Sequence, residues 1–173
     1  TKIHNPNVGR RAYTPADFEK EPVPETVDES CFEVVDALIA EFGSERFMMG
    51  PSGHEVGVYL LDGNIEEGGE GFVYGLMQYL DNPETVRAAI SYEVKKNNFL
   101  DSHYIRPGQD AVGWGQDFAS TQGPFISPDM FRGFALPAIR ERVRNIHENY
   151  RLPVMKHACG NNPKLADLFV EAG

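Results

Sequence analysis

Hydrophobic residues recur at helical spacing in the first part of the chain after Asp28. They lie three or four positions apart, as on one face of a helix, and Gly43 follows the last of them. These residues are Phe32, Val35, Leu38, Ile39 and Phe42. The pattern predicts a helix that begins near Asp28 and ends at Gly43.

Later helices are predicted by a capping residue followed by proline. Asn82-Pro83-Glu84 begins one helix, which is predicted to extend to about Tyr104. Ser127-Pro128-Asp129 repeats the signature, and Pro137 predicts a kink or a restart in the helix that follows. Asn162-Pro163 caps a last helix.

Short apolar stretches between the helices predict buried strands. They are Arg46–Gly50, Ala111–Gly115 and Leu152–Cys159. Residues 56–80 are ambiguous, and helices are predicted there on either side of a break at residues 66–69. Strand, loop and helix follow one another without a hairpin signal. The sequence therefore predicts a parallel α/β fold.

The length of the chain limits the architecture further. A complete (β/α)₈ barrel takes about 250 residues. This chain has 173 residues and three predicted strands. We therefore expect only a central part of a TIM barrel, over residues 28–173, after an irregular, proline-rich segment at residues 1–27.

Composition and charge exclude several classes of partner. The chain is 41% hydrophobic and 24% charged, as in ordinary globular proteins, and its net charge is -10. Such a charge repels nucleic acid and anionic membranes. Without a long apolar run, a signal-peptide pattern or a disulfide framework, the chain is expected in the cytoplasm. Cys31, next to Phe32, is predicted to be a buried core residue.

The third predicted strand carries the most specific chemistry, a His157-x-Cys159 pair followed by Gly160. Side chains alternate along a strand, so His157 and Cys159 point to one side and Lys156 to the other, outward between helices. An imidazole and a thiolate at one point make half of a tetrahedral zinc site. The alternative is a buried histidine beside a buried cysteine, each satisfied by its neighbours.

Polar residues after the first two strands are further candidates. Asp117 is predicted to hold substrate, to orient a zinc ligand, or only to cap its loop. Glu55 is a second catalytic candidate, which could complete or gate a zinc shell. The alternative is that Glu55 and its neighbour His54 are solvated loop residues. Candidates for binding substrate are His54, Gln116, Ser120 and Gln122.

Two blocks of the sequence resemble the uroporphyrinogen decarboxylase superfamily. The first runs from Gly115 to Arg132 and includes Gly123-Pro124-Phe125-Ile126-Ser127-Pro128; the second is His157-Ala158-Cys159-Gly160-Asn161. The resemblance implies a TIM barrel whose members are longer than this chain at both ends. Asp117 matches an acidic position of the family, where Gln116 replaces a second acid.

The superfamily has two branches with different chemistry. True decarboxylases bind a carboxylate-rich tetrapyrrole through N-terminal arginines and an aspartate, and Arg10-Arg11 stands in a different context. The other branch comprises cobalamin-dependent methyltransferases, which hold zinc on a His-x-Cys pair and a later cysteine. His157 and Cys159 match that pair, and the later ligand is expected beyond Gly173.

The resemblance thus implies zinc-dependent methyl transfer to or from cobalamin carried by a partner corrinoid protein. The small-molecule substrate would be a methoxyl or methyl donor, or a thiol acceptor. One alternative is a lyase that decarboxylates a tetrapyrrole. The other is a catalytically incomplete barrel fragment, which is expected to self-associate because its sheet is open.

Overall fold

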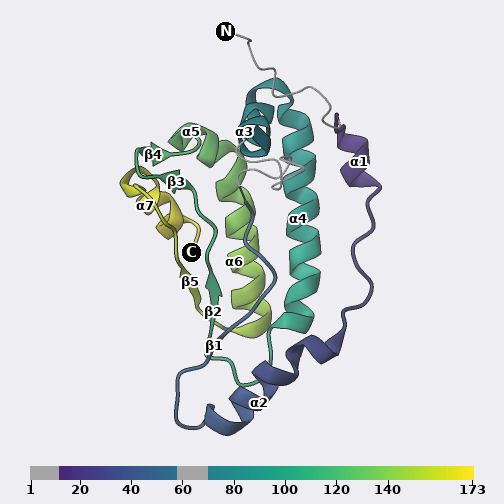
Figure 1. Cartoon of the computed structure of the whole chain (residues 1–173), viewed down its shortest axis with the longest axis vertical. Helices are drawn as coiled ribbons and strands as arrows, with labels where there is room; N and C mark the ends of the chain where they lie inside the picture. Colours follow the sequence, from purple (N-terminus) through teal and green to yellow (C-terminus); the bar gives the residue numbers. More distant parts are fainter. Residues whose placement is uncertain (1–11, 58–69) are drawn as a thin grey trace.

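The computed structural model describes residues 12–57 and 70–173 of the chain (Figure 1). The first part contains helix α1 (Pro15–Glu19), a 3₁₀ helix η1 (Glu29–Phe32), helix α2 (Glu33–Phe42) and strand β1 (Met49–Gly50). The second part contains α3 (Glu70–Asp81), α4 (Pro83–Tyr104), β2 (Ala111–Trp114), β3 (Ala119–Ser120), β4 (Gly123–Pro124), α5 (Pro128–Met130), a π-helical segment η3 (Phe131–Ala135), α6 (Leu136–Tyr150), β5 (Val154–Lys156) and α7 (Pro163–Glu171). No helix within these ranges is long and apolar enough to cross a membrane. The predicted break at residues 66–69 lies outside the described residues.

Three strands form a parallel sheet in the order β1-β2-β5. Gly50 lies beside Val112 of β2, and Val112 lies beside Val154 of β5. This arrangement confirms the parallel α/β fold that the sequence predicts. In the described part of the chain the sheet does not close into a barrel.

A short antiparallel hairpin follows β2, where the sequence predicts only a loop. Strands β3 and β4 pair Ala119 with Pro124 and Ser120 with Gly123. Each strand has two residues, which is too short to give an alternating pattern of apolar and polar positions. The expectation that the chain lacks hairpins is therefore wrong at this point.

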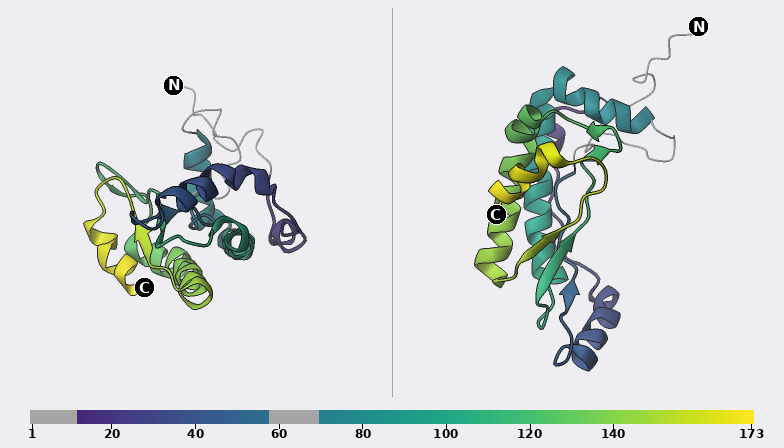
Figure 2. Two further views of the ribbon diagram at one scale, coloured as in Figure 1. Left: turned by 90° about the horizontal axis from the view of Figure 1, so that it is seen from below. Right: turned by 90° about the vertical axis from the view of Figure 1, so that its left-hand side faces the viewer.

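The two faces of the parallel sheet have different surroundings. Helices α4 and α6 lie on one side of the parallel sheet (Figure 2). Val112 and Trp114 of β2 are buried in one core with residues of these helices. On the other face Met49 and Met155 are 51% and 54% exposed, and Gly113 lies between their strands. The core thus lies between the sheet and the helices, whereas the second face is open.

The helix before β5 changes its winding close to Pro137, as the sequence predicts. The π-helical segment η3 ends at Ala135, and regular α-helix continues from Leu136. Pro137 has no N–H group to donate to the carbonyl four residues earlier, that of Gly133. The side chain of Arg87 in α4 donates to this Gly133 oxygen instead, at 2.7 Å. The irregular turn is therefore tied to the neighbouring helix.

A buried ion pair joins α4 to α6 behind the sheet. The guanidinium of Arg142 donates two hydrogen bonds to the carboxylate of Asp101, and both side chains are fully buried. The amide of Asn145 donates to the same carboxylate at 2.7 Å. The ring of Trp114 lies 5.6 Å from the guanidinium carbon, so the pair also packs directly under β2.

The same pair holds the loop that follows β1. Arg142 donates to the carbonyl oxygens of Gly53 (3.0 Å) and His54 (3.3 Å), while the Gly53 N–H donates to Asp101 (2.9 Å). Asn97 accepts from the His54 N–H at 2.9 Å. A Cβ atom on Gly53 would lie 2.2 Å from the Asn97 carbonyl oxygen, so only glycine allows this approach. The loop is therefore fixed by its backbone.

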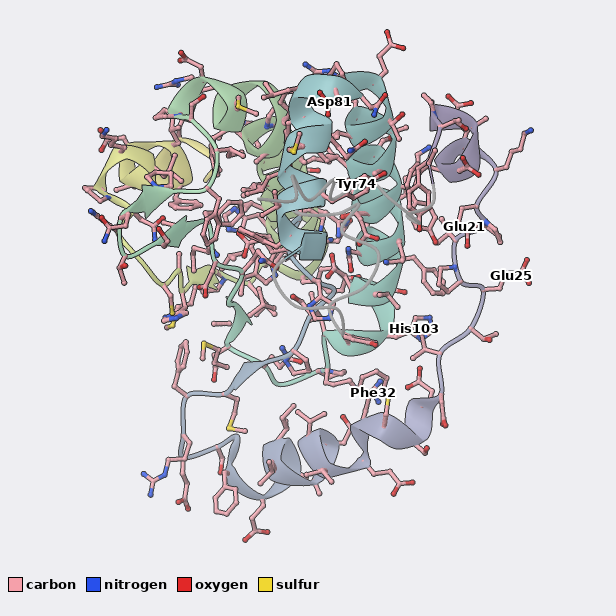
Figure 3. All side chains as sticks on the ribbon, turned by 45° about the horizontal axis from the view of Figure 1, so that its top comes forward. Glu21, Glu25, Phe32, Tyr74, Asp81 and His103 are labelled. Atoms are coloured by element: carbon pink, nitrogen blue, oxygen red, sulfur yellow. The ribbon has the colours of Figure 1, made fainter. Side chains whose placement is uncertain are left out.

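Helix α2 packs against the C-terminal end of α4 through charged and aromatic groups. Arg106 bonds Asp36 and Glu29, and His103 lies 2.8 Å from Glu29. Figure 3 shows Phe32 and His103 at this junction. Cys31 is exposed rather than buried, which corrects the sequence prediction. Helix α2, which follows Cys31, has no buried residue, and Leu38 and Phe42 of the predicted buried face are exposed, so this face is not part of the core.

Replacement of Arg142 by Met should destabilise the protein by about 3–5 kcal/mol, because it leaves Asp101 as a buried charge without its partner. Equilibrium unfolding in urea measures this change in the free energy of unfolding. Arg140→Met on the same helix is the matched control; it removes an exposed pair with Glu171 and should cost less than about 1 kcal/mol. Equal losses in the two variants would contradict the prediction.

Candidate metal centre

The end of β5 places His157 and Cys159 side by side. The His157 N–H donates to the Trp114 carbonyl oxygen at 2.8 Å, so the ladder with β2 continues one residue beyond the strand. Nε2 of His157 lies 3.0 Å from Sγ of Cys159, and both residues are exposed. The predicted convergence of the two side chains is confirmed. The alternative of a buried His and a buried Cys is wrong.

Glycine and asparagine shape the turn that carries the pair. Gly160 has a φ of 85°, and a Cβ atom there would lie 2.3 Å from the Ala119 carbonyl oxygen. The Asn161 N–H donates to the Ser120 carbonyl oxygen at 2.8 Å, and the Asn162 side chain donates to the Cys159 carbonyl oxygen at 2.6 Å. The turn therefore packs closely against the β3–β4 hairpin, which requires glycine directly after Cys159.

Asp117 is the third member of the cluster and comes from the loop after β2. Its Oδ1 accepts the backbone N–H of Cys159 at 2.7 Å. One ligand atom each of Asp117, His157 and Cys159 lie within 4.8 Å of one another. Two loops that are 40 residues apart in the sequence thus bring a carboxylate, an imidazole and a thiol to one point.

The charges within this cluster oppose a free thiolate. The N–H of Cys159 stabilises the ionised carboxylate and holds the pKa of Asp117 below its usual range. The Asp117 carboxylate, by hydrogen bonding and by its charge, raises the pKa of the Cys159 thiol. A bound cation would reverse this relation, because it would neutralise both negative groups.

The donor atoms suit zinc. Zinc prefers cysteine sulfur, histidine nitrogen and carboxylate oxygen, and catalytic zinc sites have three protein ligands and one open position. The Asp117 carboxylate has a second oxygen besides the one that accepts the Cys159 N–H. Thus the residues of this structure fit a zinc ion, with Asp117 as a ligand or as a group that orients Cys159.

Glu55 lies apart from this cluster, so it does not complete a zinc shell. Its side chain is 2% exposed, and its Oε2 lies 2.8 Å from Nζ of Lys156. Lys156 also donates to the Gln116 carbonyl oxygen, and its ammonium lies 4.9 Å from the centre of the Phe118 ring. Lys156 is directed away from His157, as predicted, but the expectation that it extends outward is wrong. It forms an ion pair with the buried Glu55 and is itself part-buried.

Burial acts on the protonation of both partners. It raises the pKa of Glu55 to about 7 although Lys156 opposes the shift, and it lowers the pKa of Lys156 although Glu55 opposes that shift. Among the described residues, Oε1 of Glu55 has no hydrogen-bond partner. The sequence carried a signal for this pair: a charged residue on the buried side of a strand requires a partner.

The loops after β1 and β2 line a cleft of about 420 Å³. His54 and Gln116, both predicted to bind substrate, line this cleft, and so does Glu55. Its remaining lining residues are Pro51, Ser52, Gly53, Gly113, Trp114 and Gly115. Gln116 directly precedes Asp117 in the chain, so the cleft extends to the start of the loop that carries Asp117.

Ser120 and Gln122, the other two residues predicted to bind substrate, lie in the β3–β4 hairpin. The Ser120 hydroxyl accepts the Gln122 N–H at 3.1 Å and lies 3.4 Å from the Gly123 carbonyl oxygen. Neither residue belongs to the lining of the cleft. In this structure Ser120 stabilises the turn that supports Gly160.

Comparison with known proteins defines the family. A family model described as uroporphyrinogen decarboxylase (URO-D) matches residues 1–173. The chain therefore belongs to the uroporphyrinogen decarboxylase family, as the sequence blocks imply. Its members are TIM-barrel enzymes, and the match does not distinguish decarboxylases from methyltransferases. Searches of the curated proteins and of the solved structures gave no match.

Replacement of Asp117 by Asn should make Cys159 more reactive at neutral pH. The substitution removes the charge that raises the thiol pKa, so more thiolate is present to react. The measurement is the rate of iodoacetamide alkylation at Cys159, followed by peptide mass spectrometry. The exposed Cys31 of the same molecule is the internal control. An unchanged or slower reaction at Cys159 would contradict the proposed effect of Asp117.

Glu55→Gln should become more stable relative to the wild type as the pH rises from about 4.5 to about 7. The folded pKa of Glu55 lies above its ordinary value, so the folded protein loses stability as this carboxyl ionises in that window. Glutamine stays neutral and has a similar shape. Urea unfolding of both proteins at several pH values tests this, and a constant difference across the window would refute it.

Proposed function

We propose that the protein takes part in zinc-dependent transfer of a methyl group to or from cobalamin carried by a partner corrinoid protein. The observation that carries this proposal is the convergence of His157, Cys159 and Asp117 at the carboxyl ends of adjacent strands. In barrels of this class the carboxyl ends of the strands form the active-site face. Sulfur, nitrogen and oxygen donors at one exposed point there support a metal centre.

His157 and Cys159 would hold the zinc ion together with Asp117 or with a ligand outside this chain. When bound, zinc supplies Lewis acidity, which lowers the pKa of a coordinated thiol or polarises a coordinated oxygen. The protein's own groups have separate tasks. Asp117 holds the backbone of Cys159 in place, and the hairpin fixes the turn from the other side.

The small substrate is proposed to bind in the cleft between the loops after β1 and β2. Its volume of about 420 Å³ suits a small molecule. His54 and Gln116 contribute polar side chains to its lining, and a Cβ atom on Gly115 would meet no described atom within 4 Å, so the backbone is open there. A methoxyl or methyl donor, or a thiol acceptor, would then lie next to Asp117 and the metal ligands.

The exposure of His157 and Cys159 supports a reaction with a cofactor that arrives on another protein. A corrinoid bound to its carrier must approach the metal ligands from outside, and these side chains are accessible on the open side of the chain. Their donors are held by backbone contacts rather than by burial. A macromolecular partner therefore fits this site.

Decarboxylation of a tetrapyrrole is the second candidate, because it is equally compatible with the family. A substrate with many carboxylates needs cationic groups around it. Among the described residues, those that line the cleft include neither arginine nor lysine, and they include Glu55. The lining therefore supports a less anionic substrate, in favour of methyl transfer.

The purified chain should bind about one zinc ion, and the His157→Ala, Cys159→Ala double variant should bind none. Metal analysis after dialysis against zinc measures the content, and circular dichroism checks that the variant folds. Cys31→Ala is the matched control and should keep its zinc. Methyl transfer between a corrinoid protein and candidate substrates tests the reaction itself. Zinc that remains in the double variant, or turnover of porphyrinogen without metal, would contradict the proposal.

A further inference from the structure

We propose that the Glu55–Lys156 ion pair is a positioning device that sets the His157–Cys159 turn against Asp117. Its consequence for zinc rests on the proposed function, whereas the positioning itself concerns only the polypeptide. Neither residue belongs to the cluster of candidate ligands. Both would act through the backbone next to those ligands.

Lys156 connects the ends of all three parallel strands. It is the last residue of β5, and its ammonium donates to Glu55, after β1, and to the carbonyl oxygen of Gln116, after β2. The Gln116 N–H in turn lies 3.3 Å from the Glu55 carboxylate. The three loops that border the cleft and the metal ligands therefore meet at one ion pair.

These contacts matter for the site because the groups that form them are covalently bonded to the residues that carry the candidate ligands. The Gln116 carbonyl belongs to the peptide group that joins Gln116 to Asp117. The peptide group after Lys156 leads to His157. A single side chain thus fixes the peptide group before Asp117 relative to the residue before His157. The distance between the carboxylate and the His157–Cys159 turn depends on it.

The surroundings hold this side chain in one conformation. The Lys156 side chain is 17% exposed and that of Glu55 is 2% exposed, unlike the long side chains of surface pairs. The rings of Phe118 and Phe169 lie 4.9 Å and 5.6 Å from the ammonium. Aromatic faces attract a cation and restrict its movement. The ion pair therefore holds the Lys156 ammonium in one defined position.

A role in global stability alone would give a different result on substitution. Apolar residues of similar size often replace a buried ion pair without loss of stability. The Glu55→Leu, Lys156→Met double variant would fill the same space, but it could not donate a hydrogen bond to the Gln116 carbonyl. The positioning role predicts that this double variant folds normally and still loosens the turn.

Hydrogen exchange of backbone amides in the full chain without added metal tests the positioning directly. The informative amides are those of His157, which donates to Trp114, and Cys159, which donates to Asp117. In Lys156→Met and in the Glu55→Leu, Lys156→Met double variant, both should exchange at least about 10-fold faster, because the turn opens more often. The amides of α6 should keep their rates in the double variant.

Two further variants serve as controls. Glu55→Gln keeps an oxygen that accepts from Lys156, so its turn should exchange within about 3-fold of the wild type. Lys96→Met removes a lysine that pairs with Glu93 at 2.6 Å and lies over the Tyr92 ring, on the far helix α4. It matches Lys156 in chemistry but not in place, and it should leave the turn unchanged.

Metal titration of the same proteins adds a spectroscopic measurement. Cobalt(II), used in place of zinc, should show thiolate charge transfer and a four-coordinate visible spectrum in the wild type, Glu55→Gln and Lys96→Met. The double variant should bind cobalt at least about 10-fold more weakly and show altered visible bands, since misplaced ligands lower metal affinity. A purely structural role would change the melting temperature without changing the spectrum.

The outcomes separate this inference from the proposed function. Wild-type exchange rates at His157 and Cys159 in the double variant would overturn the positioning role, whatever the metal affinity. A double variant that fails to fold would also overturn it, since the pair would then be needed for the whole fold. A wild type that binds no metal would remove the proposed function, while the exchange rates would still decide the role of the pair.

Discussion

The buried pair of Arg142 and Asp101 is the constraint on which the rest of the structure depends. The loop after β1 turns inward, where its backbone groups find no partner in the sheet. A buried peptide group without a hydrogen bond costs about 1–3 kcal/mol, and Arg142, Asp101 and Asn97 supply the missing bonds at Gly53 and His54. The packing of helices α4 and α6 thereby determines where Glu55 lies.

Two further sets of contacts connect this loop to the candidate site. Glu55 and Lys156 join the ends of β1 and β5, and the Gln116 carbonyl adds the end of β2. On the other side, the hairpin holds the turn through Gly160 and Asn161. The candidate ligands are thus exposed, yet the backbone beneath them is fixed by buried contacts. This combination suits a centre that must be both accessible and well defined.

Local patterns in the sequence were enough to predict some of these features. Asn82-Pro83 gives the start of α4 at Pro83, and the predicted convergence of His157 and Cys159 occurs directly after β5, which ends at Lys156. Cys31 is exposed because α2 buries none of its residues, although its apolar spacing predicts a buried face. The inward direction of Lys156 was missed because its partner lies 101 positions away, beyond the range of any local pattern.

The hydrogen bond between Asp117 and the Cys159 backbone has a consequence for oxidation. Oxidants attack a thiolate much faster than a thiol, and the first product, a sulfenic acid, proceeds to irreversible forms. Because the neighbouring carboxylate raises the pKa of Cys159, the exposed sulfur stays protonated at neutral pH when no cation is bound. The Asp117 carboxylate therefore protects the exposed Cys159 sulfur from oxidation, and the sulfur stays reduced, as the proposed metal centre would require.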